Sequence, residues 1–120
     1  MDTKLVMAAT AIILLFNCSG NPKTIDERLV GRWNGYLIDL ENGEKIEPLV
    51  MEFTIDKAYN QFIYVGGELQ NFMTGTFWTK GNTIYVKTPY RKKIEKVEYE
   101  VKDNKLIIIN NGITNEFVKN

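Results

Sequence analysis

The chain has 120 residues, with 15 basic and 15 acidic side chains, no histidine and one cysteine. A balanced charge gives no general attraction to nucleic acid, so we expect no nucleic-acid partner. Without histidine, neither Ser-His nor Cys-His nucleophile pairs can form, and the commonest metal ligand is missing. The acidic residues alternate along strand faces as solvated charges do. We therefore expect a protein that is not an enzyme and that needs neither a metal nor a cofactor.

The first 17 residues have the organisation of an export signal. Lys4 lies in a short polar start, and an uninterrupted apolar run of 12 residues follows from Leu5 to Phe16. A helix needs about 20 apolar residues to cross a bilayer, so this run is too short for a transmembrane span. We interpret residues 1–17 as a signal peptide.

Cys18 follows the apolar run, and the segment that ends there resembles the lipobox of bacterial lipoproteins, with Leu15 three positions before the cysteine. Asn17 stands where that family prefers a small residue. The resemblance implies cleavage before Cys18, lipidation of its sulfur and acylation of its new amino group, with palmitate as an expected acyl chain. Ser19 favours an outer-membrane location by the same resemblance. Two alternatives remain open: ordinary secretory cleavage near Ser19 or Gly20, and an uncleaved anchor.

Removal of the signal peptide leaves 103 residues (120 − 17), enough for one small domain with one core. In this organisation, residues 18–28 hold the lipidated cysteine, a polar tether and a short helical turn, and residues 29–120 form the domain. Thr24 and Glu27 fit a capping box, in which each side chain bonds the backbone N–H of the other residue. The capping box predicts one helical turn through Leu29.

From residue 30 onward the pattern is typical of β-strands. Val97, Tyr99 and Val101 alternate with charged residues, which predicts a strand with one apolar face. Other runs rich in Val, Ile, Thr, Tyr and Phe are separated by Asn-Gly, Gly-Asn and Asp-Asn pairs that favour tight turns. We expect strands near 31–40, 48–56, 60–66, 71–79, 83–88, 94–102, 105–110 and 113–119.

Eight short strands without room for long crossovers predict an all-β fold, an antiparallel up-and-down barrel whose closure removes unpaired edges. In the first strand, the apolar residues Trp33 and Leu37 lie at odd positions, whereas Tyr36 and Ile38 lie at even positions. A regular strand turns only the odd or only the even positions inward. We therefore expect a bulge at Gly35, where one extra residue would reverse the alternation and let both sets face the interior.

The start of the first strand, Gly-Arg-Trp at 31–33, resembles the Gly-x-Trp opening of lipocalin-like barrel proteins. Later segments are similar to the looser repeat of compact bacterial lipocalin-like domains, namely Gly75–Trp78, Gly81–Val86 and Val97–Val101. The resemblance implies a lipocalin-like barrel whose floor is closed by Trp33 beneath a basic residue of the last strand, here Lys119.

Aromatic side chains are candidates for lining a ligand cavity. Packing in a filled core is the simpler interpretation, because barrels of this size are often filled by their own side chains. The candidate ligand-lining or core residues are Phe53, Phe62, Phe77 and Tyr99. Further aromatic residues with the same two interpretations are Tyr64, Phe72, Trp78 and Tyr85.

One basic cluster, Tyr90 followed by Arg91, Lys92 and Lys93, is a candidate loop for contact with an acidic partner or with lipid headgroups. The alternative is a solvated loop whose charge is offset by nearby glutamates such as Glu95.

Together these features predict a monomeric, membrane-anchored lipoprotein of the bacterial cell envelope that binds a small apolar ligand or a protein partner through its barrel. One alternative is a periplasmic or surface inhibitor of a hydrolase, which would block an active site with a protruding loop. A second alternative is a structural or assembly component of the envelope. A cavity that runs inward from the barrel mouth would favour the ligand, and a filled interior with a rigid loop at 89–93 would favour protein contact.

Overall fold

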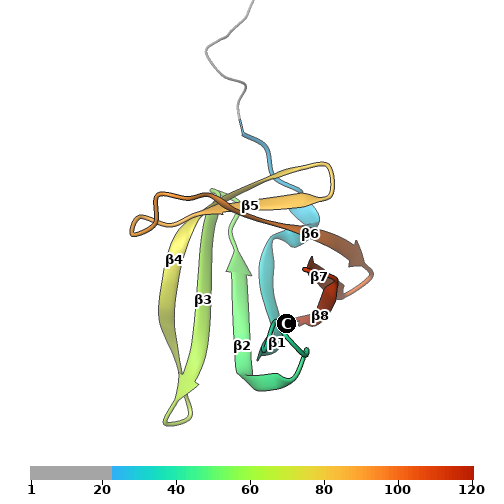
Figure 1. Ribbon diagram of the computed structural model, residues 1–120. Helices are drawn as coiled ribbons and strands as arrows, with labels where there is room; N and C mark the ends of the chain where they lie inside the picture. Colours follow the sequence, from blue (N-terminus) through green and yellow to red (C-terminus); the bar gives the residue numbers. More distant parts are fainter. Residues whose placement is uncertain (1–22) are drawn as a thin grey trace, which may run out of the picture.

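The computed structural model describes residues 23–120 (Figure 1). The predicted signal peptide, its cleavage site and Cys18 lie outside the described residues. The described chain begins with a 3₁₀ helix, η1 (Glu27–Leu29), and continues almost entirely as strands. The strands are β1 (Gly31–Ile38), β2 (Lys45–Phe53), β3 (Ala58–Val65), β4 (Glu68–Lys80), β5 (Thr83–Lys87), β6 (Glu95–Lys102), β7 (Lys105–Asn110) and β8 (Ile113–Lys119).

The eight strands form one closed barrel in which each strand pairs with its neighbours in sequence. All pairings are antiparallel, and β8 closes the barrel on β1 by placing Trp33 opposite Lys119 and Asn34 opposite Val118. This confirms the predicted all-β, up-and-down barrel of eight strands. Closure satisfies the backbone N–H and C=O groups that an open sheet would leave unpaired at its edges.

Tight turns explain why consecutive strands pair. Gly66 and Gly67 join β3 to β4, and Asn111 and Gly112 join β7 to β8. All four residues have positive φ, between 52° and 85°. Two-residue hairpin turns of this kind need left-handed backbone at both positions, which glycine and asparagine adopt at low cost.

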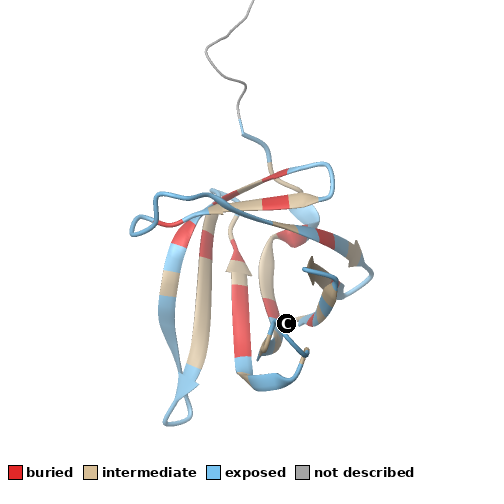
Figure 2. Ribbon diagram, viewed as in Figure 1, coloured by how far each residue is buried: buried red, intermediate tan, exposed pale blue. Residues whose placement is uncertain are grey.

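The core follows the alternation of the strands (Figure 2). Each of the eight strands contributes at least one large inward side chain that is at most 5% exposed, including Tyr59 of β3 and Ile84 of β5. The predicted apolar face of β6 is confirmed, because Tyr99 lies in the core and Val97 and Val101 pack against it. The most deeply buried side chains are Trp33, Phe53, Phe77, Phe117, Leu29, Ile84 and Leu106.

The predicted capping box is wrong. Asp26, not Thr24, caps the helical turn, because its side chain accepts a hydrogen bond of 3.1 Å from the backbone N–H of Arg28. Thr24 instead pairs with β4: the Thr79 N–H donates to the Thr24 carbonyl at 2.8 Å, and the Thr24 hydroxyl donates to the Thr79 carbonyl at 3.4 Å. A tertiary backbone partner thus replaces the local bonds that the capping box would make.

The bulge predicted at Gly35 is wrong, and the irregularity of β1 lies further along the strand. Gly35 pairs regularly with Leu49, and the register shifts between Leu37 and Ile38, close to the end of β1. Gly35 serves packing instead: a Cβ built there would lie 2.3 Å from Cδ2 of Phe117. The missing side chain makes room for a core aromatic ring.

Strand boundaries differ from the predicted ones by up to three residues. β2 begins at Lys45 rather than 48 and ends at Phe53 rather than 56. The turn that follows is held by Thr54, whose hydroxyl accepts from the Ala58 N–H at 2.9 Å, and Lys57 within it has φ 75°. The hydrogen bonds of this turn therefore end the strand at Phe53, although the alternation of apolar residues in the sequence continues beyond it.

Candidate functional site

The two ends of the barrel are built differently. Because neighbouring strands are antiparallel, their connections alternate between the ends. The end that we call the closed end carries the connections 54–57, 81–82 and 103–104 together with segment 24–30. The end that we call the open end carries the connections 39–44, 66–67, 88–94 and 111–112.

Trp33 and Lys119 meet at the closed end. Trp33 is fully buried, and its indole N–H donates to the carbonyl of Leu29 at 2.8 Å. The Lys119 ammonium lies 5.0 Å from the centre of the Trp33 ring and donates to the carbonyl of Val30 at 2.7 Å. The cation thus faces the aromatic ring and also satisfies a carbonyl just after η1.

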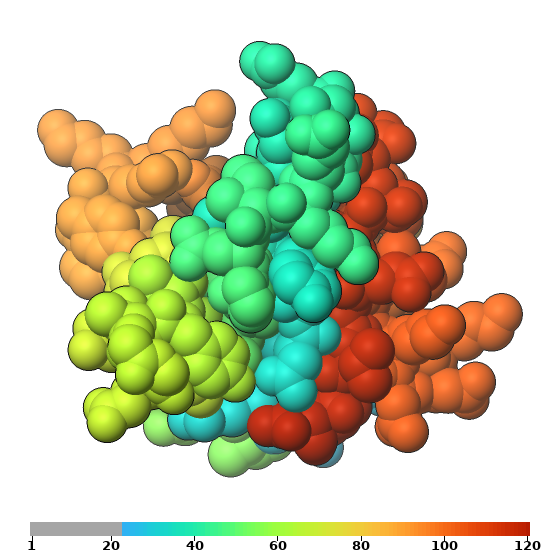
Figure 3. Space-filling model, turned by 90° about the horizontal axis from the view of Figure 1, so that it is seen from below, coloured from blue at the N-terminus to red at the C-terminus, as the bar shows by residue number. Residues whose placement is uncertain are grey.

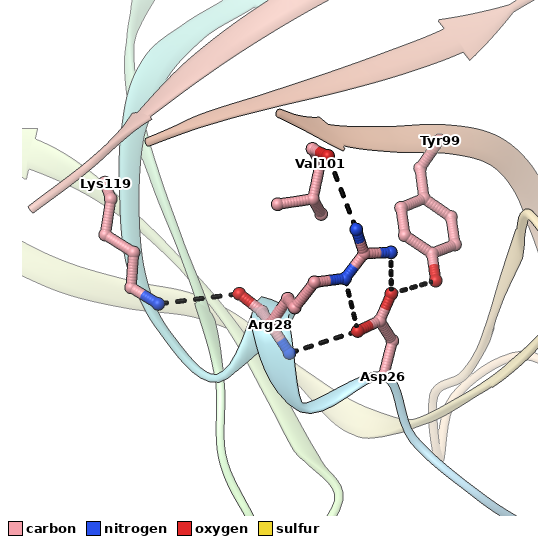
Figure 4. Close-up of polar contacts among 5 residues, drawn as sticks. All are labelled: Asp26, Arg28, Tyr99, Val101 and Lys119. Carbon is pink, nitrogen blue, oxygen red and sulfur yellow. Dashed lines mark hydrogen bonds and ion pairs between the residues drawn. The ribbon is translucent and has the colours of Figure 1, made fainter. Parts of the chain in front are cut away.

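A polar cluster ties η1 to the barrel wall (Figure 4). The Asp26 carboxylate accepts from Arg28 Nε at 3.0 Å and Nη2 at 2.7 Å, and from the Tyr99 hydroxyl at 2.7 Å. Hydrogen bonds from Arg28, together with that from Tyr99, outweigh partial burial and lower the pKa of Asp26 to about 2. Burial, reinforced by the bond to Asp26, raises the pKa of Tyr99 to about 12.

These pKa values assign the cluster a structural role. A general acid or base works best with a pKa near the operating pH. Asp26 stays ionised and Tyr99 stays protonated across the neutral range, so neither changes its charge there. The cluster holds the segment that covers the closed end.

The open end contains a cavity of about 260 Å³ that reaches inward to the core. Its floor is formed by Phe53, Ile84 and Phe117, which belong to the most deeply buried side chains of the barrel. The walls above them are mainly aliphatic or thioether side chains, including Leu37, Leu49, Met51, Met73, Val86 and Ile108.

A few polar groups also line the cavity. Gln61 donates from its amide to the hydroxyl of Tyr59, and burial raises the pKa of Tyr59, which keeps that hydroxyl protonated. Asn115 donates to the carbonyl of Tyr36 at 2.9 Å. Glu95 is the lining carboxylate, and it is paired with Arg91. The cavity therefore combines a mainly apolar wall with a few polar groups, a combination typical of sites for small organic molecules.

The 88–94 connection stands beside this cavity. It projects from the open end at the upper left of Figure 3, apart from the β1–β2 connection. Tyr90 is 61% exposed, and Arg91 forms an ion pair with Glu95, the first residue of β6. The structure places the predicted contact residues Tyr90, Arg91, Lys92 and Lys93 together on an exposed loop.

Comparisons with known proteins give the fold and no function. No protein-family model matches the chain, and no curated protein matches it. Among solved structures, the chain is similar to an uncharacterized protein from Bacteroides eggerthii DSM 20697, with a TM-score of 0.63 and 13% sequence identity. The similarity covers 77% of this chain and 99% of that chain. At this identity the likeness supports the barrel alone.

The structure brings three of the four candidate lining residues inside the barrel. Phe53 and Phe77 pack edge to face with ring centres 4.9 Å apart, and Tyr99 lies in the same core. Of these residues, Phe53 lines the open-end cavity.

Phe62 is the fourth candidate, and its predicted inward position is wrong. Its β2 partner is Val50, whereas the neighbouring pair on each side, Leu49 with Ile63 and Met51 with Gln61, faces the interior. Phe62 therefore lies on the outer wall, where the Arg32 guanidinium stacks on its ring at 4.7 Å. Parity in β3 decides this, because adjacent residues point to opposite faces.

Four further aromatic candidates also lie outside. Tyr64 and Phe72 are 50% and 45% exposed, and Trp78 stacks on Tyr85 on the outer wall. The cavity is lined mostly by aliphatic and methionine side chains. A search for aromatic residues alone therefore misses most of its lining. The alternation of Leu49, Met51 and Phe53 along β2 is the sequence signal that would find them.

The described residues contain no group of three or more acidic or cysteine side chains placed to hold a metal ion. Within residues 23–120, no helix has the length and apolar character required to span a membrane.

Proposed function

We propose that the protein is a non-enzymatic lipoprotein of the bacterial cell envelope, with a lipocalin-like barrel that binds a small apolar ligand at its open end. The observation that carries this proposal is the cavity of about 260 Å³, which has an aliphatic wall above an aromatic floor. Burial of apolar surface is the main source of affinity in such a site.

The cavity limits the size of the ligand. One water molecule occupies about 30 Å³ of the liquid, so 260 Å³ holds roughly nine groups of that size. This is just below the range of about 300–1,000 Å³ that is usual for ligand pockets. A single-ring compound or a short acyl chain fits. Met51 and Met73 on the wall adapt to irregular apolar shapes, and the Tyr59–Gln61 pair offers hydrogen bonds to one polar group.

The anchor in this proposal is a lipidated Cys18 in the outer membrane. It is supported by the signal-like residues 1–17, by the lipobox resemblance, and by the position of Lys23, which follows Cys18 by five positions and already lies against the barrel. Two or three acyl chains hold a protein stably, whereas one chain holds only marginally. Metabolic labelling with a fatty acid should mark the wild type and not Cys18→Ala. Equal labelling of both would overturn the anchor.

Ligand binding is tested by native mass spectrometry of residues 21–120 expressed in the native host, compared with a variant whose cavity is filled. Ile108 lines the cavity, and Ile108→Trp should fill much of it. Ile107 neighbours it on β7 and faces outward, so Ile107→Trp is the matched control. We expect a co-purified small molecule on the wild type and the control, and none on Ile108→Trp. A wild type without any bound small molecule would count against the ligand.

A second candidate function is inhibition of a hydrolase through the 88–94 loop. The projection of this loop and the 61% exposure of Tyr90 favour it. Tyrosine and arginine are among the side chains that are enriched at binding hot spots. Tyr90→Ala should then abolish inhibition and leave the ligand in the cavity. A structural role in the envelope is a third possibility, and it predicts that neither Tyr90→Ala nor Ile108→Trp alters binding to any partner.

A further inference from the structure

The outer wall of β4, β5 and β6 carries lysines around two aromatic rings. Trp78 on β4 is paired with Tyr85 on β5, and Tyr85 is paired with Lys96 on β6. The inward neighbours of Trp78 and Tyr85 are core side chains, so both rings point away from the interior, and Lys96 lies opposite Tyr85 at the rim of the open-end cavity. We call this surface the basic face; its residues are Lys23, Trp78, Lys80, Tyr85, Lys87 and Lys96.

The centre of the basic face is an aromatic stack with a lysine above it. The rings of Trp78 and Tyr85 are nearly parallel, with centres 5.5 Å apart and 4° between their planes. The Lys23 ammonium lies 4.1 Å from the centre of the Trp78 ring. Tryptophan and tyrosine favour the boundary between water and lipid, because one end of each ring system is apolar and the other bonds water.

Lysines outnumber carboxylates on the basic face. Among residues 23–120, no ion pair engages Lys80, Lys87 or Lys96, and Glu98 is the acidic residue of β6 nearest to them on this wall. The adjoining 88–94 loop adds Lys92 and Lys93. On the wall of β1 and β2, by contrast, Arg32 pairs with Glu52 at 3.0 Å, and the two charges cancel.

The chain enters the barrel on this same face. Thr24 is hydrogen-bonded to Thr79 of β4, next to Trp78, and in Figure 1 the described chain begins at the top of the view, where β5 lies. Lys23 follows Cys18 by five positions, and five residues span at most about 18 Å. An acyl anchor at Cys18 therefore keeps Lys23, where the chain reaches the basic face, within about 18 Å of the lipidated residue.

We propose that the basic face rests on anionic phospholipid headgroups of the membrane that holds the anchor, an inference that depends on the proposed lipidation of Cys18. Lysines near an anionic leaflet are attracted to it, and the Trp78–Tyr85 stack lies at headgroup level. The barrel then lies on its side. Its open end faces along the membrane, with the 88–94 loop at the surface.

The two tryptophans of the chain give a direct test. Trp33 is fully buried in the barrel floor, whereas Trp78 lies at the centre of the basic face. The full chain, purified from its native membranes, is reconstituted in vesicles of phosphatidylcholine and phosphatidylglycerol that contain a lipid with a nitroxide on its headgroup. We expect quenching of the Trp78 share of the fluorescence. Trp78→Phe, which leaves only the buried Trp33, should show almost none.

Charge variants test whether the lysines of the basic face bind the anionic headgroups or whether Trp78 is merely close to the membrane. Lys87→Gln/Lys96→Gln should reduce the quenching at least twofold, and so should vesicles of phosphatidylcholine alone. Lys102→Gln/Lys105→Gln removes the same charge at the β6–β7 turn and is the matched control, which should quench like the wild type. Equal quenching of all charge variants, or quenching that persists in Trp78→Phe, would overturn the placement.

Flotation of the same samples distinguishes failure of the lipid anchor from failure of the placement on the basic face. A chain that floats with the vesicles while Trp78 stays unquenched retains its anchor but does not lie on the basic face. A chain that does not float has no lipid anchor, and both the anchor and this placement then fail.

Discussion

Replacement of Asp26 by asparagine tests whether the closed end is held by an ionised carboxylate. Asp26 is bonded by Arg28 and Tyr99, its side chain is 16% exposed, and its pKa falls from 3.8 to about 2 in the folded state. At about 1.4 kcal/mol per pKa unit, the full difference corresponds to roughly 2–3 kcal/mol. Because Arg28 is 63% exposed, solvent screening reduces the expected contribution of the Asp26 carboxylate to about 1–2 kcal/mol.

The pH dependence has a defined sign and window. A carboxyl whose pKa is lower in the folded state stabilises the fold above its unfolded pKa, so the contribution of Asp26 is complete above about pH 4. It is lost as the pH falls from about 4 to about 2. Urea unfolding midpoints measured from pH 7 to pH 2 should show this loss in the wild type, and Asp26→Asn should be less stable at pH 7 and lose less stability in this window.

Asp103→Asn makes the same chemical change at an exposed turn of the closed end and is the matched control. It should leave both the stability at pH 7 and the acid dependence close to those of the wild type. If Asp26→Asn unfolds in parallel with the wild type over the whole range, the carboxylate does not contribute as an ion, and the reasoning from the Arg28 and Tyr99 bonds is refuted.

Three further predictions concern packing, each read out by thermal or urea unfolding. Gly35→Ala should cost about 1–3 kcal/mol, because its Cβ would lie 2.3 Å from the ring of Phe117; a cost near zero would contradict the close contact. Phe53→Ala should cost about 3–5 kcal/mol and the outer Phe62→Ala less than about 1, and equal costs would contradict their assignment to opposite faces. Thr88→Val should be neutral or stabilising, because the Thr88 hydroxyl is buried without a hydrogen-bond partner in residues 23–120; a loss above about 1 kcal/mol would show that the hydroxyl is bonded.

The barrel could be predicted because its rules are local. Alternation along β6 places Tyr99 inward whatever the neighbouring strand is, and glycine at 66, 67 and 112 permits turns that pair consecutive strands. Eight such strands in a short chain leave closure as the arrangement that satisfies every edge.

The lining of the candidate site could be predicted only in part, because it depends on register across strands. Phe53 and Phe62 are both aromatic strand residues, yet the β2–β3 pairing turns the first inward and the second outward. The parity conflict in β1 does indicate a bulge. The register shift lies after Leu37 because β1 pairs regularly with β2 up to that residue. The order of odd and even apolar positions in the sequence does not indicate where this regular pairing ends.

The sequence by itself determined the strand count, the antiparallel order and the balanced charge, since hydrophobic period, turn chemistry and composition are properties of neighbouring residues. Only the tertiary structure decided the rest. It places Lys119 over Trp33, bonds Asp26 to Tyr99 and leaves the open half of the barrel hollow, and it gathers Lys23, Lys80, Lys87 and Lys96 on one wall. The contacts of Lys119 with Trp33 and of Asp26 with Tyr99 join residues far apart in the chain, and the pairing of β4, β5 and β6 brings the lysines together.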